Sequence, residues 1–284
     1  MRKLPSAREI ELAAAADRPP STQGAALPRS EALTMLVRRG FRPSRAGLDV
    51  PFVGNLGEET AERLTKQLGH YAFRLFLRGA IQKPEGFAPA EATHYLKTPQ
   101  AKACAESLVE LGLAERLARG RYRLLKPAKS FGGTLEWFVA RELQHKLGFD
   151  AASGVRLHAR GVGGDVDVVA AAEGKLVYLE LKSSPPKNLS AREVAAFFDR
   201  LSLLRPDLSL FVVDTALRLS DKVLPMLVGE LEQRRGETRL VPRRIVREIW
   251  ALTPRLYAAN GRSDLIANVG RALAEGLRAL SPTL

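Results

Sequence analysis

The sequence has a single cysteine, Cys104, among its 284 residues. One thiol can form neither an intrachain disulfide nor a cysteine-rich zinc site, which favours a reducing compartment. No run approaches the roughly 20 apolar residues of a membrane-spanning helix. The N-terminal segment is interrupted by Glu9, Glu11 and Asp17, unlike the apolar part of a signal peptide. We therefore expect a cytoplasmic protein that does not contact a membrane.

Two common catalytic signatures are also missing. The sequence contains no GxxxxGK[ST] phosphate loop, so nothing indicates an ATP-driven motor. The histidines His70, His94, His145 and His158 are scattered and lack the spacing of metal ligands. Structural or surface roles are expected for them.

Positive charge, by contrast, is in excess. The chain has 44 Lys and Arg against 31 Asp and Glu, a net charge of +13, while 45% of its residues are hydrophobic. The hydrophobic content is that of an ordinary globular protein. A net charge of this size attracts polyanions, chiefly nucleic acid or an anionic membrane surface. Because no membrane segment is expected, nucleic acid is the favoured partner.

Composition and periodicity divide the chain into three parts. Residues 1–30 are rich in Ala, Pro, Ser and Arg and are expected to form a flexible arm. Residues 31–128 are mainly helical. Residues 129–284 alternate helices with strands, which predicts an α/β fold with a mixed sheet. Its last part, 236–284, is expected to be helical and either extends a DNA-facing surface, closes the core or forms a homodimer.

Residues 70–126 predict three helices followed by a basic hairpin centred on Arg119-Gly120. Thr98 is the expected N-cap of the third helix, with Pro99 at the first helical position. This order resembles a winged helix-turn-helix. The resemblance implies contacts with a nucleic-acid groove and with phosphates, made by Thr98, Gln100, Lys102, Arg119, Arg121 and Arg123. The alternative is a helical interaction module whose arginines are solvated.

The α/β part begins with a predicted helix at 134–147 that has Thr134 as its N-cap. Further elements follow as strands at 154–160, 165–172 and 175–182, a helix at 191–204, a strand at 208–215 and a helix at 221–234. This succession supports the mixed sheet.

Charged residues interrupt two of these apolar strands. Side chains alternate between the faces of a strand, so Asp165 and Asp167 share one face, as do Glu180 and Lys182. If the strands pair across the Glu173-Gly174 turn, Asp167 lies beside Glu180. Adjacent carboxylates repel each other unless a cation compensates them, and Mg²⁺ prefers oxygen ligands, water and phosphate. The pattern predicts a site that cleaves phosphodiesters.

Asp167, the apolar run after it, and Glu180-Leu181-Lys182 resemble the PD-(D/E)xK nuclease superfamily, which has the restriction-endonuclease-like fold. That group includes restriction enzymes, archaeal Holliday junction resolvases and RecB-type nuclease domains. The resemblance covers about residues 130–235. It implies that Asp167 and Glu180 bind Mg²⁺ or Mn²⁺, that Lys182 orients or helps to deprotonate the attacking water, and that Glu136 completes the metal shell.

The first motif departs from the family pattern, because Gly164-Asp165-Val166-Asp167 stands where the family has Pro-Asp. Asp167 is preferred as the ligand since it directly precedes the apolar run. The alternatives are that Asp165 is an auxiliary metal ligand or that Asp165, and not Asp167, is the principal one.

The sequence therefore predicts a metal-dependent DNA endonuclease whose winged-helix module positions the substrate. It acts alone or through a recruiting protein partner, and double-strand or branch cutting would require two active sites, as in a homodimer. The alternatives are a non-catalytic DNA-binding protein, either a regulator or a subunit of a defence or repair complex, and an RNA-processing nuclease.

Overall fold

The computed structural model describes residues 30–53, 56–158, 165–236 and 239–281. Apart from Ser30, the predicted N-terminal arm lies outside the described residues, as does the predicted turn at 161–164. No helix in the described ranges is both long enough and apolar enough to cross a membrane.

The centre of the molecule is a mixed sheet that has eight strands in the described part of the chain. In spatial order the strands are β1 (Pro43–Arg45), β4 (Asp150–Leu157), β5 (Asp165–Ala172), β6 (Lys175–Lys182), β7 (Leu208–Val213), β10 (Leu256–Asn260), β9 (Ile249–Thr253) and β8 (Arg243–Val246). Strand β7 is parallel to both β6 and β10, while the other neighbours are antiparallel. Every residue of β7 is buried, as expected for a central strand covered on both faces.

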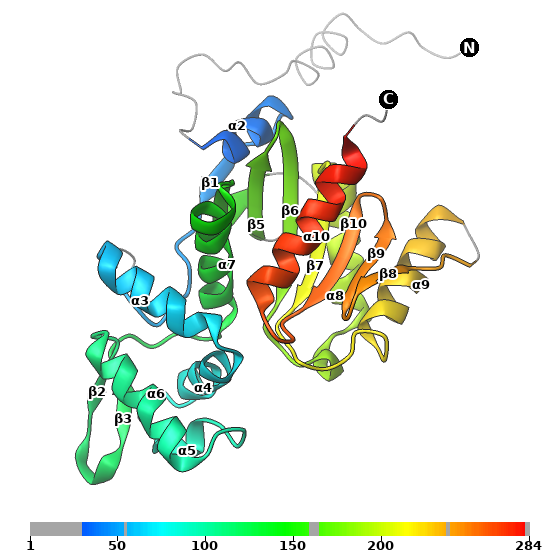
Figure 1. Ribbon diagram of the computed structural model, residues 1–284. Helices are drawn as coiled ribbons and strands as arrows, with labels where there is room; N and C mark the ends of the chain where they lie inside the picture. The colour runs from blue at the N-terminus through cyan, green and yellow to red at the C-terminus, as the bar shows by residue number, and fades with distance from the viewer. Residues whose placement is uncertain (1–29, 54–55, 159–164, 237–238, 282–284) are drawn as a thin grey trace, which may run out of the picture.

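Helices cover both faces of this sheet (Figure 1). One face packs against α7 (Gly132–Leu147) and α10 (Leu265–Leu280). The other packs against α2 (Glu31–Arg38), α8 (Ala191–Leu204) and α9 (Val223–Arg235). The apolar stripe of α8 explains its placement, because Val194, Phe197 and Phe198 are buried against the sheet. The result is a three-layer arrangement, and its mixed α/β class is the one that the alternating sequence pattern predicted.

A helical module lies beside α7, at the lower left of Figure 1. It consists of α3 (Glu58–Gly69), α4 (Tyr71–Ile81), α5 (Pro89–Ala92), α6 (Thr98–Glu110) and a hairpin of β2 (Ala114–Arg116) and β3 (Tyr122–Leu124). Short 3₁₀ turns are found at Ala118–Gly120, within the hairpin, and at Pro186–Asn188, before α8. The predicted order of three helices and a hairpin is therefore present.

The helical module and the sheet share one hydrophobic core, in which Phe76 and Leu108 belong to the same cluster as Leu179. A buried ion pair also joins them. The Arg74 guanidinium, from α4, donates to Asp214, directly after β7, across 3.0 Å, and both residues are at most 1% exposed. Arg78 Nη2 donates to the second oxygen of Asp214 across 2.9 Å. The module is thus fixed at the C-terminal end of the central strand β7.

Residues 31–45 belong to the sheet layers, although the sequence grouped them with the helical part. Strand β1 pairs with β4, and α2 contacts β4 and β5. Ser30 caps α2 by accepting a hydrogen bond from the Leu33 amide. The predicted boundary at 128/129 stays a prediction.

Two expected helix caps are wrong. Helix α6 has Lys97 as its N-cap, and the Gln100 side chain accepts a hydrogen bond from the Lys97 amide, so Thr98 is already helical. Helix α7 begins two residues earlier than predicted, at Gly132, which places Thr134 in its buried first turn.

The prediction of a helical C-terminal region is wrong for residues 243–260, which form β8, β9 and β10. Their short apolar runs extend the sheet beyond β7, where burial and ladder hydrogen bonds outweigh helix propensity. The turn between β8 and β9 contains no glycine. Arg247 instead adopts the left-handed conformation, with φ 49°. Only the predicted helix at the end of the chain is present, as α10.

Candidate active site

Strands β5 and β6 pair in an antiparallel hairpin, as the sequence predicted. Val168 lies opposite Leu179, so the residues just outside this pair are Asp167 and Glu180. Asp167 Oδ2 accepts a hydrogen bond of 2.7 Å from the Leu181 amide. The strand pairing therefore brings the Asp167 carboxylate to the end of β6 that carries Glu180 and Lys182.

Glu180 is buried, with 1% of its surface exposed, and both of its oxygens are hydrogen-bonded. Arg200 Nη2, from α8, lies 2.7 Å from Oε1 and 2.8 Å from Oε2. The Tyr178 hydroxyl donates to Oε2, and Lys182 Nζ is 2.9 Å from Oε1. The two nearby cations and the phenol offset the cost of burying this acidic side chain.

Asp167 and Glu136 lack comparable compensation. Burial, followed by repulsion from Glu180 and Glu136, holds the pKa of Asp167 well above its usual range. Burial, and after it the charges of Asp165 and Glu180, raise the pKa of Glu136 to about 7, against the opposing effects of the Gly154 amide and Lys182. These raised pKa values describe a group of carboxylates short of positive charge.

Lys182 stays protonated in this setting. Burial works against its charge, but attraction to Glu180 and Asp167 outweighs burial and raises the pKa of the amine above its ordinary value. Its Nζ also lies 3.5 Å from Glu193, in the first turn of α8. In this protonated form the amine can neutralise or orient a neighbour but cannot accept a proton.

Asp165 lies apart from the buried group. Its side chain is 45% exposed and pairs with Arg156 across the β4–β5 ladder, with 2.9 Å between Nε and Oδ1. It influences Glu136 through its charge, but Asp167 is the aspartate that lies against β6.

The oxygen donors suit a hard divalent cation such as Mg²⁺ or Mn²⁺ in their chemistry. Within the described ranges, however, no group of three or more His, Cys, Asp or Glu side chains is arranged to hold a metal ion by itself. Mg²⁺ is commonly bound through one or two carboxylates, with water and substrate phosphate completing its shell. Asp167 and Glu180, helped by Glu136, are the residues that would hold such an ion.

The residues expected to contact nucleic acid lie on the surface of the helical module. Thr98, Gln100 and Lys102 are exposed on α6. Arg119 is exposed at the tip of the hairpin, and no hydrogen bond or ion pair of its side chain is found among the described residues. The remaining two arginines have partners in the module: Arg121 donates to the Gly86 carbonyl, and Arg123 pairs with Glu115.

Sequence reasoning missed Arg200 and Tyr178. The two-residue spacing from Tyr178 to Glu180 places both on one face of β6, so the strand periodicity contained this contact. No local signal connects Arg200 with Glu180, because the contact depends on how α8 packs on the sheet. Burial works against the charge of Arg200, but Tyr178 and Glu180 outweigh it and hold the pKa of the guanidinium above its ordinary value.

The sequence matches no protein-family model and no curated protein. Among solved structures, the fold is similar to that of protein VC1899 from Vibrio cholerae, with a TM-score of 0.52 and 12% identity over 90% of this chain and 66% of VC1899. Can2 from Sulfobacillus thermosulfidooxidans, solved in complex with cyclic tetra-adenylate, gives a TM-score of 0.46 and 16% identity over 86% of this chain and 59% of Can2.

The chain thus spans less than two thirds of the length of either neighbour. At this identity the likeness to VC1899 concerns the fold alone. The fold and the buried carboxylates together define a mixed α/β protein with a candidate acidic site at the ends of β5 and β6.

Proposed function

We propose that the chain is a divalent-metal-dependent nuclease of the restriction-endonuclease-like type, with DNA as its substrate. The observation that carries this proposal is the position of Asp167 against the end of β6, beside buried Glu180 and protonated Lys182. Two buried carboxylates short of positive charge, Asp167 and Glu136, lie near Glu180 and an ammonium group, and this arrangement suits a cation and a phosphate better than it suits a structural core.

Each residue then has a separate role. Asp167 and Glu180 hold the metal, which when bound activates water and stabilises the charge that develops on phosphorus oxygens. Lys182 remains a cation that orients the water or the scissile phosphate. Arg200 and Tyr178 fix the rotamer of Glu180 through its two oxygens.

Several features support DNA as the substrate. The net charge is +13, and the helical module ends in a hairpin with Arg119 at its tip, whose side chain has no hydrogen bond or ion pair with any residue that the structure describes. The order from α4 to β3 supports a winged-helix module that positions duplex DNA.

The test is cleavage of labelled single-stranded, duplex and branched DNA, and of RNA, with Mg²⁺, Mn²⁺ or EDTA. Asp167→Asn, Glu180→Gln and Lys182→Met should each reduce metal-dependent cutting by at least about 100-fold, whereas the exposed acid Glu59, changed to Gln, should leave it intact. Asp165→Asn decides between the two aspartates: full activity in this variant assigns the ligand to Asp167. Binding of Mn²⁺ by calorimetry provides a readout that does not depend on turnover.

A second candidate is a DNA-binding protein that uses this fold only as a scaffold. The bidentate contact between Arg200 and Glu180 favours it, because this contact already neutralises the carboxylate without a metal. Equal DNA binding by wild type and all site variants, with no cutting of any substrate and no Mn²⁺ binding, would establish this function instead. Cleavage confined to RNA would establish the RNA-processing alternative.

A further inference from the structure

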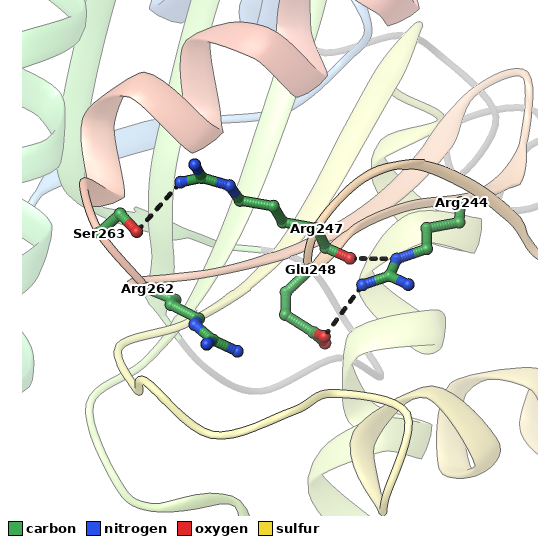
Figure 2. Close-up of a pocket in the computed structure, with 5 residues that line it drawn as sticks. All are labelled: Arg244, Arg247, Glu248, Arg262 and Ser263. Atoms are coloured by element: carbon green, nitrogen blue, oxygen red, sulfur yellow. Dashed lines mark hydrogen bonds and ion pairs between the residues drawn. The ribbon is translucent and has the colours of Figure 1, made fainter.

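Away from the carboxylates, the structure forms a basic pocket with a volume of about 450 Å³ (Figure 2). We name it the arginine pocket, and its lining residues are Arg244, Arg247, Glu248, Arg262 and Ser263. Arg244 belongs to β8, Arg247 and Glu248 form the turn between β8 and β9, and Arg262 and Ser263 belong to the connection from β10 to α10. With three arginines and one glutamate, the pocket has a net charge of +2.

Most of the lining is held in place by contacts within the pocket (Figure 2). Arg247 Nη1 donates to Ser263 Oγ across 3.2 Å, and Arg244 Nε donates to the Arg247 carbonyl. Arg244 also lies 5.5 Å from the centre of the Trp250 ring and 3.7 Å from Glu248. The Glu248 carboxylate, buried, accepts a hydrogen bond from the Leu219 amide. The pocket is therefore pre-organised.

Arg262 differs from the other two arginines. Its backbone is fixed, since its amide donates to Asn260 and its carbonyl accepts from Asn268. Figure 2 draws no interaction between its guanidinium group and the other lining residues, and no hydrogen bond or ion pair of this group is found in the described part of the chain. A planar guanidinium with free donors, next to two like charges, is suited to bidentate binding of a phosphate group.

The pocket lies near the C-terminal ends of the central strands, as the candidate active site does. In the parallel part of the sheet, Lys182 pairs with Val213, and Val213 pairs with Asn260. Neighbouring strands are about 4.8 Å apart, so the Lys182 and Asn260 backbones are separated by about 10 Å. Arg262 follows Asn260 by two residues. A nucleic-acid strand that reaches Lys182 can therefore extend to Arg262 within a short stretch of backbone.

We propose that the arginine pocket binds a phosphate group of the nucleic-acid strand whose neighbouring phosphodiester lies at Asp167, Glu180 and Lys182. This inference rests on the proposed function for the identity of the strand. The phosphate is either a backbone phosphodiester or a terminal monophosphate, and the two share the same chemistry of recognition. Arg262 and Arg247 bind it directly, while Glu248 and Trp250 hold Arg244 in position.

The test measures binding in EDTA, where no cleavage occurs, of single-stranded oligonucleotides with and without a 5′-phosphate, and of inorganic phosphate as competitor. Arg262→Gln is compared with Arg271→Gln, a matched loss of charge at an exposed position on α10 outside the pocket. We expect Arg262→Gln to weaken binding by about 10-fold and to lower the slope of log affinity against log salt by about 0.7. Arg271→Gln should change the affinity less than twofold, and Arg262→Lys should be intermediate.

The arms of the experiment also identify the source of the phosphate. A 10-fold loss seen only with the 5′-phosphorylated strand assigns the pocket to a terminal phosphate, and an equal loss with both strands assigns it to the backbone. Equal effects of Arg262→Gln and Arg271→Gln would overturn the proposal, because the arginines would then act only through the overall charge. Because binding is measured without metal, the test of the arginine pocket remains valid even if the protein proves not to cleave nucleic acid.

Discussion

Glu180 is an acidic residue buried in the protein, and its contacts with neighbouring side chains determine how much its burial costs in folding free energy. Arg200 contacts both of its oxygens, and the Tyr178 hydroxyl and Lys182 complete its surroundings. Removing one member of a buried pair leaves the other uncompensated, and this costs more than the pair contributes by itself.

Arg200→Ala is therefore expected to lower the free energy of unfolding by about 3 kcal/mol. Adding Glu180→Gln should restore a large part of this loss, because the neutral amide no longer requires a cation. Urea denaturation of the two single variants and the double variant measures both effects. Arg192→Ala, an exposed arginine on the same helix, is the control and should stay within about 0.5 kcal/mol of wild type. A loss no larger than that of the control would contradict the role given to Arg200.

At the scale of elements, the hairpin of β2 and β3 has an unfavourable backbone conformation at its tip. Arg119, at its tip, has φ 60°, a left-handed conformation that favours glycine. For an L-residue this conformation costs about 1–2 kcal/mol. Under the proposed function, contact with phosphate would account for an arginine at this position, whereas Arg121 and Arg123 also have partners within the module.

Arg119→Gly should consequently separate binding from stability. We expect its thermal stability to be equal to or slightly above that of wild type, and its affinity for duplex DNA to fall by several-fold with a salt slope reduced by about 0.9. Fluorescence anisotropy at several salt concentrations, combined with thermal denaturation, measures both quantities. Unchanged affinity together with unchanged stability would leave the hairpin without a role in DNA binding.

The elements also show how far sequence reasoning reaches. Strands β5 and β6 and helix α8 were predictable because apolar periodicity and the Glu173-Gly174 turn are local features. Strands β8 and β9 were not, since their turn is formed by Arg247 without a glycine or asparagine signal. The arginine pocket depends on that turn and on the loop after β10, so it was hidden for the same reason.

Within the candidate site, the proximity of Asp167 to Glu180 follows from strand register and was predictable. The contacts of Arg200 with Glu180 and of Arg74 with Asp214 depend on how distant helices pack on the sheet. Two positions 140 residues apart carry no local sequence signal of their contact.

For the molecule as a whole, the shared core and the buried pair of Arg74 and Asp214 predict that the helical module and the sheet unfold together. Circular dichroism and the hydrogen exchange of amides in α4 and β7 should report one common transition. Asp214→Ala should lower the free energy of unfolding by about 3–5 kcal/mol, because Arg74 is then buried without a counter-charge. Loss of protection in α4 well before β7 in the wild-type protein would show instead that the two parts are independent.

The ion pair of Arg74 and Asp214 also fixes the distance between the helical module and the candidate active site. Asp214 directly follows β7, and its amide donates to the Lys182 carbonyl across 2.8 Å, so the anchor of the helical module is one strand away from the candidate catalytic lysine. A rigid joint at this point keeps the hairpin tip and the carboxylates at a constant separation. For a nuclease of the proposed kind, this constant separation implies that the cut falls a fixed number of nucleotides from the place where the hairpin contacts the duplex.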